Sequence, residues 1–146
     1  MKPRRAKKEC ACACTCLRRA ARAVTQLYDE AFRPLGYRAT QVAVLTTLAE
    51  LGPVTLSELA EETVTDRTTL TRNLRLLEKK RLICLECGDD RRERRVCLTR
   101  QGHQVLRAAV PKWAVVQKKM IRQMGQERFE RLVGDLSAVV EAVKRS

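Results

Sequence analysis

Residues 65 to 83, TDRTTLTRNLRLLEKKRLI, restrict the fold of this chain more than any other stretch. At about 100° per residue, Leu70, Leu74 and Leu77 share one side of a helix, which predicts a buried edge. The other side carries short hydroxyls and basic groups, namely Thr68, Arg72, Arg75 and Lys79. Such groups bond base edges and phosphates, whereas a merely solvated face more often carries Lys and Glu. The helix is therefore expected to face DNA, with an ordinary basic helix surface as the alternative.

Two β-rich runs follow this helix. LICLEC at 82–87 and RRVCLT at 94–99 flank the charged, glycine-containing segment GDDRRE at 88–93, which predicts a hairpin. A long wing that carries Arg91, Arg92, Arg94 and Arg95 suits the narrow minor groove of A·T-rich DNA, where negative potential is concentrated. The alternative is a solvated turn in which the arginines pair with neighbouring carboxylates.

Two shorter helices should precede the leucine-anchored one. Thr40 is a candidate cap for a helix that ends at LGP, residues 51–53. TLSE at 55–58 matches a capping box, in which Thr55 and Glu58 satisfy free backbone groups of the first turn. A helix of about 56–63 is expected to follow, so the order of elements indicates a winged helix-turn-helix.

Long amphipathic helices are expected at both ends, within 9–33 and within 103–146, and the first should run from 9 to 32. Their apolar faces exceed what a small winged domain can cover, which favours a partner chain. The predicted fold class is mainly α with a small β-hairpin wing, built as one domain over 1–146. Dimerisation helices would flank a winged helix region at 38–100, and residues 1–8 would form a basic arm.

The charge balance narrows the function. Lys and Arg total 30 against 17 acidic residues, a net charge of +13, so nucleic acid is the first expected partner and an anionic membrane the second. No run approaches the roughly 20 apolar residues of a spanning helix, and Arg18 and Arg19 interrupt any export signal. A soluble cytoplasmic protein without a membrane role is expected. His103 is the single histidine, and no catalytic arrangement is visible, so an enzyme is not expected.

A resemblance to a known family rests on DRRERRVCLTRQG, residues 90–102. The MarR family of bacterial transcription regulators has a wing signature of Asp-x-Arg, a spacer, Leu-Thr, two residues and Gly. This sequence is similar to it through Asp90, Arg92, Leu98, Thr99 and Gly102. Arg81 departs from the family, many of whose members have Gly there. The resemblance implies a homodimer whose recognition helices, here 66–80, enter successive major grooves, and a small phenolic or other aromatic acid as effector.

The expected function is a dimeric repressor or activator that reads a palindrome in double-stranded DNA. The residues expected to contact DNA are Arg67, Thr68, Thr69, Thr71, Arg72, Arg75, Arg91 and Arg92. The rival is a winged helix protein that binds nucleic acid without sequence preference and whose cysteines are structural. A specific regulator should prefer its site by roughly 10³ or more, whereas the rival should not.

Seven cysteines without a secretory signal are better interpreted as thiols than as a disulfide framework. In ECACACTC, residues 9–16, Cys10 and Cys14 extend one apolar line of the first helix, and Cys12 and Cys16 extend another, about 160° away. They are either small apolar packing residues or a redox or soft-metal site. One helix cannot gather all four sulfurs, so a metal site would need a second helix or local unwinding.

The hairpin predicts a second pair of thiols. If the chain turns between Asp90 and Arg91, Cys84 faces Cys97, and cross-strand neighbours lie near disulfide range at some registers. Cys87 would point to the other face of a regular strand, so its C-x-x-C spacing with Cys84 is weak evidence for a metal. Oxidation of the facing pair is expected to tilt the wing and weaken DNA binding, and ordinary packing is the alternative.

Overall fold

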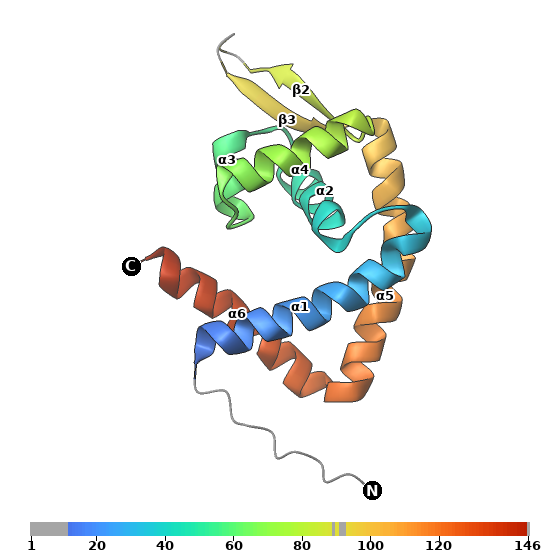
Figure 1. Ribbon diagram of the computed structural model, residues 1–146, viewed down its shortest axis with the longest axis vertical. Coiled ribbons are helices and arrows are strands. Elements are labelled where there is room, and N and C mark those ends of the chain that lie inside the picture. Colours follow the sequence, from blue (N-terminus) through green and yellow to red (C-terminus); the bar gives the residue numbers. More distant parts are fainter. Residues whose placement is uncertain (1–11, 89, 91–92, 146) are drawn as a thin grey trace, which may run out of the picture.

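The computed structural model describes residues 12–88, 90 and 93–145, and the first eleven residues, 89, 91, 92 and 146 lie outside that description. In chain order the elements are α1 (Ala13–Phe32), the 3-10 turn η1 (Arg33–Leu35), α2 (Ala39–Leu51), β1 (Val54–Thr55), α3 (Leu56–Glu62), α4 (Arg67–Lys79), β2 (Ile83–Cys87), β3 (Arg94–Leu98), α5 (Arg100–Met124) and α6 (Gln126–Lys144). Figure 1 shows α2, α3, α4 and the sheet at one end of the molecule, α1 and α6 at the other, and α5 joining them. The mainly α fold with a small β wing is confirmed.

The sheet has three strands rather than the two of the predicted hairpin. Its order is β1-β3-β2, and both pairings are antiparallel. β1 was missed because a strand of two residues has no periodicity, and only its pairing with β3 defines it. The hairpin register sets Cys84 opposite Cys97, as predicted.

Two predicted helix starts are wrong. The first helix begins at Ala13 rather than at residue 9, because Cys12 has an extended backbone and occupies the N-cap. The second begins at Ala39 with Arg38 as N-cap, so Thr40 is no cap. The backbone N–H of Ala39 donates to the Asp29 carboxylate of α1 over 2.7 Å. That acceptor comes from a different helix, which local sequence could not reveal.

The main core lies between the helix-turn-helix and the sheet. The leucine edge of α4, formed by Leu70, Leu74 and Leu77, is buried as predicted. These side chains pack in one cluster with Leu45, Leu48 and Leu59 of the preceding helices and with Leu82, Ile83 and Val96 at the sheet. The predicted capping box is present at α3, where Thr55 and Glu58 exchange hydrogen bonds. This core therefore covers the leucine edge of α4, while the opposite side of α4 stays exposed to solvent.

The Leu-Thr-x-x-Gly part of the wing signature forms the junction between β3 and α5. The Thr99 hydroxyl accepts from the Gly102 N–H over 3.1 Å and donates to the Arg81 carbonyl over 2.7 Å. Gly102 is buried so close to the turn after α4 that an added Cβ would lie 2.2 Å from the Leu82 carbonyl oxygen. The motif thus fixes α5 against the base of the wing, and α5 begins at Arg100, three residues before the predicted 103.

Arg81, where many family members have Gly, has a left-handed backbone with φ of 59°. A side chain in that region costs roughly 1–2 kcal/mol, part of which the extra freedom of an unfolded glycine would offset. We expect Arg81→Gly to raise the free energy of unfolding in urea by about 0.5 kcal/mol. Arg81→Ala is the control, because it removes the charge but keeps the Cβ. Equal unfolding free energies for the Gly and Ala variants would contradict this strain argument.

The C-terminal helix is not covered by its own chain. All residues of α6 belong to the described part, and none of them is buried. Its exposed apolar residues are Val133, Leu136, Val139, Val140 and Val143. An apolar hollow of about 570 Å³ lies between α1, α5 and α6 and is lined by residues including Leu17, Val24, Met120, Phe129 and Leu132.

Among the described residues, no helix is long and apolar enough to cross a membrane.

Candidate DNA-binding surface and wing thiol cluster

The start of α4 is held by two polar contacts that sequence reasoning did not assign. Asp66 is the N-cap, and its carboxylate accepts from the Thr69 N–H over 2.8 Å. Hydrogen bonds from the Thr69 hydroxyl and backbone lower the pKa of Asp66 below its usual value, so the cap is ionised at neutral pH. Arg67 donates to the Ser57 hydroxyl of α3, which joins the two helices of the helix-turn-helix. The Asp66 cap was detectable from an acidic residue directly before the periodic leucines.

The predicted DNA-contacting residues of α4 share one surface. Arg67, Thr68, Thr69, Arg72 and Arg75 are exposed, and Thr71 is half-buried. Five of them line a shallow hollow along the helix, namely Arg67, Thr68, Thr71, Arg72 and Arg75. Because the leucines on the other side of α4 are buried, this face points to solvent. Its hydroxyls and guanidinium groups can therefore contact one ligand that lies along the helix. Guanidinium groups bind guanine edges or phosphates, and threonines contact phosphates or thymine methyls.

The wing contributes further basic residues, of which the structure describes some. Arg91 and Arg92, both predicted to contact DNA, lie outside the described residues. Arg94 is exposed, and Arg95 forms an ion pair with Glu93 over 3.4 Å. That ion pair belongs to the alternative interpretation of the turn, in which arginines pair with acidic neighbours. Among the described arginines of the wing it engages only Arg95, one of the four expected to suit the minor groove.

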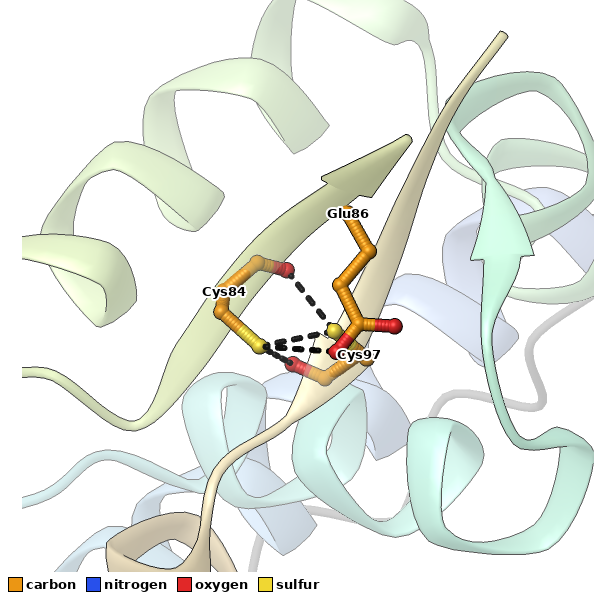
Figure 2. Close-up of side chains that lie close together, drawn as sticks. All are labelled: Cys84, Glu86 and Cys97. Atoms are coloured by element: carbon orange, nitrogen blue, oxygen red, sulfur yellow. Dashed lines mark hydrogen bonds between the residues drawn. The ribbon is translucent and has the colours of Figure 1, made fainter. Parts of the chain in front are cut away.

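The facing cysteines of the wing form a compact cluster with Glu86, shown in Figure 2. Cys84 lies on β2 and Cys97 on β3, and their Sγ atoms are 2.7 Å apart. The Glu86 side chain bends back toward both sulfurs, and the three ligand atoms lie within 4.8 Å of one another. Within the described ranges, this is the one group of at least three Cys, His, Asp or Glu residues that could hold a metal ion.

The two thiols differ in their surroundings. Cys97 is buried and Cys84 is half-buried. Burial, the hydrogen bond with Cys84 and the nearby Glu86 carboxylate raise the pKa of the Cys97 thiol to about 12. Cys97 is therefore protonated at neutral pH, which leaves the more accessible Cys84 as the candidate nucleophile. Glu86 was not predicted, although its spacing of two from Cys84 puts it on the same face of a strand.

The N-terminal cysteines are described in part. Cys10 lies outside the described residues, Cys12 and Cys14 are exposed, and Cys16 is half-buried beside the hollow between α1, α5 and α6. The backbone N–H of Thr15, then its hydroxyl, lowers the pKa of the Cys12 thiol. No metal-ligand group is formed by the three that fall within the described part of α1 and its cap. Cys16 is disulfide-bonded, so the expectation that the cysteines are thiols is wrong for this residue. A role of these cysteines in sensing stays a prediction.

Comparison with known proteins decides the family. Residues 35–93 match the model of the MarR family. The transcriptional regulator MosR of M. tuberculosis, solved in complex with DNA, is 37% identical and superposes with a TM-score of 0.82. The match covers 92% of this chain and 97% of MosR. The chain belongs to the MarR family. The resemblance drawn from the wing signature is thereby confirmed.

Other MarR-like relatives are more distant. A probable transcriptional regulator from Pseudomonas aeruginosa is 26% identical with a TM-score of 0.79, over 87% of this chain and 96% of its own. The HTH-type transcriptional regulator YwoH of Bacillus subtilis is 28% identical over 88 residues. That match spans 64% of the length of YwoH and 60% of this chain. Both relatives are described as transcriptional regulators, and the Pseudomonas aeruginosa structure shares the fold of this MarR-family chain.

Proposed function

We propose that this MarR-family chain is a homodimeric, sequence-specific DNA-binding regulator. The observation that carries the proposal is the exposed face of α4, where Arg72 and Arg75 stand beside Thr68 and Thr71 while three leucines anchor the helix. The net charge of +13 supports a polyanionic partner. MosR, the relative of 37% identity, was solved with DNA, which supports the same partner here.

A second copy of the chain is the proposed occupant of the apolar surface on α1, α5 and α6. The apolar stripe of α6 is uncovered, and it adjoins the hollow of about 570 Å³ between the same three helices. A monomer that exposes so many valines and leucines along one helix is unusual, whereas a symmetric partner buries both copies at once. Dimerisation would set two α4 helices about one DNA turn apart, so we expect half-sites centred about 10 base pairs apart.

The test begins with selection of duplexes from a random library by the full-length protein, followed by affinity measurements on the selected site and on unrelated DNA. We expect a preference of roughly 10³ for the selected site. Arg72→Ala should lose about tenfold or more of that preference, because a bidentate contact to a base edge is removed. Arg92→Ala should weaken binding to all sequences more evenly, because a minor-groove arginine acts mainly on backbone shape and charge.

Lys118→Ala is the matched control, because it removes one exposed positive charge on α5 away from the α4 surface. It should leave the preference for the selected site unchanged. The logarithm of the affinity should fall with the logarithm of salt concentration by about 0.9 per phosphate neutralised. Equal affinity of the parent for all duplexes would instead support the nonspecific nucleic-acid-binding alternative.

An effector that releases the DNA completes the proposal. The candidates are a small aromatic acid, oxidation of thiols and a soft metal bound by thiolates. Two sulfurs and a carboxylate meet in the thiol cluster of the wing, which makes it a place where thiols react but does not by itself make it a device that releases DNA. The cysteines near the start of α1 remain additional candidates.

A further inference from the structure

The backbone already places Cys84 and Cys97 at a position that suits a disulfide. The Thr99 N–H donates to the Leu82 carbonyl over 3.0 Å, and the Gly88 N–H donates to the Glu93 carbonyl over 2.8 Å. Hydrogen-bonded pairs alternate along an antiparallel ladder, so the Cys84 and Cys97 pair is itself hydrogen-bonded, with Cα atoms about 5.5 Å apart. Disulfides span Cα distances of about 4.4–6.8 Å. No change of register is needed to join the two sulfurs.

The sulfur geometry favours a disulfide over a metal. The two Sγ atoms are 2.7 Å apart and must approach by only about 0.6 Å to reach a bond of about 2.05 Å. Two thiolates on a tetrahedral zinc, at about 2.3 Å from the ion, would instead be separated by about 3.8 Å.

We propose that Cys84 and Cys97 form an intramolecular disulfide when the protein reacts with a hydroperoxide, and that this bond covalently links the strands β2 and β3 of the wing. The thiolate of Cys84, the more exposed partner, attacks the peroxide oxygen and becomes a sulfenic acid, and the peroxide is released as an alcohol or water. The Cys97 sulfur then attacks the Cys84 sulfur. The S–S bond forms, the S–O bond breaks, and hydroxide leaves with the Cys97 proton as water. Two thiols are oxidised and one peroxide is reduced.

The consequence is a stiffer wing rather than a tilted one. Cys84 and Cys97 lie on the sheet face opposite Ile83 and Val96, which belong to the core, so closing the bond does not disturb that packing. The small movement argues against the tilt and the weaker DNA binding expected from the sequence. Formation of the disulfide does not depend on DNA binding. Only its meaning for regulation rests on the proposed function. We expect the oxidised protein still to bind DNA.

The first experiment treats the reduced full-length protein with hydrogen peroxide and maps its cysteines by mass spectrometry. We expect a peptide pair joined through Cys84 and Cys97, with no gain of oxygen on either sulfur. A variant that keeps only these two cysteines, with Cys10, Cys12, Cys14 and Cys16 changed to Ala and Cys87 to Ser, should lose two hydrogens in its intact mass. Its Tm should rise by about 5 °C on oxidation, because the bond closes a loop.

The matched control carries Cys97→Ala in the same background, and its Tm should not respond to the oxidant. The DNA affinity of the two-cysteine variant should change by less than about threefold on oxidation. This affinity is measured on the selected duplex, in an experiment separate from the mapping of the thiols. Sulfinic acid on Cys84, or one zinc per chain that protects the reduced pair when zinc chloride is added, would overturn the disulfide. A disulfide with a loss of affinity above about threefold would overturn the expectation that the oxidised wing still binds DNA, and a disulfide without a rise in Tm would overturn the stabilisation of the wing.

Discussion

Gly102→Ala should destabilise the protein by about 3 kcal/mol, the largest effect expected from a single methyl group in this chain. The added Cβ would lie 2.2 Å from the Leu82 carbonyl oxygen and 3.1 Å from the Leu98 side chain. A flexible side chain would be pushed aside at small cost, but this oxygen belongs to a backbone carbonyl that accepts from the Thr99 N–H. Either α5 moves away from the wing or that hydrogen bond is broken. Urea denaturation followed by circular dichroism measures the loss.

Gly134→Ala is the control for this substitution. Gly134 lies in α6, and an added Cβ would meet no atom within 4 Å. Alanine has a higher helix propensity than glycine, so this variant should gain about 0.5–1 kcal/mol. The two variants make the same chemical change in helices, and only the surroundings differ. Similar losses of stability in both would show that the close approach at Gly102 is unimportant.

Val140→Glu should convert the proposed dimer into a monomer and lower the affinity for the selected duplex by about 100-fold or more. Val140 is exposed in the apolar stripe of α6, which the rest of its own chain leaves uncovered. A carboxylate there would be desolvated opposite the apolar surface of a second copy. Two linked α4 helices bind one duplex with a high effective concentration, and separated chains lose that advantage. Analytical ultracentrifugation and DNA titration measure the two effects.

Ala138→Glu is the matched control, because it adds the same charge to α6 at an exposed position about 160° around the helix from Val140. It should leave both the mass and the DNA affinity of the parent. A monomeric parent protein, or a dimeric Val140→Glu variant with full affinity, would contradict the assignment of the second copy to this face. Neither outcome would alter the arrangement of α4 within one chain.

Elements whose signals are local could be predicted from the amino-acid sequence alone. The leucines at 70, 74 and 77 predicted the buried edge of α4, because helical periodicity places them together whatever they pack against. The box at Thr55 and Glu58 predicted the start of α3, because both partners lie within one turn. The hairpin register, with Cys84 opposite Cys97, followed from where the chain reverses. The exposed side of α4, which we propose faces DNA, was predictable for the same reason, as the complement of its leucines.

Other features depend on residues that are far apart in the chain, so they became visible only in the folded structure. Asp29 of α1 supplies the acceptor at the start of α2, which is why Thr40 is not the cap. β1 is defined by its pairing with β3, about 40 residues later in the chain, in which Val54 faces Val96 and Thr55 faces Arg95. Gly102 needs to be glycine because the Leu82 carbonyl oxygen is adjacent in space. Periodicity assigns a face to each helix, but long-range contacts decide which atoms meet there.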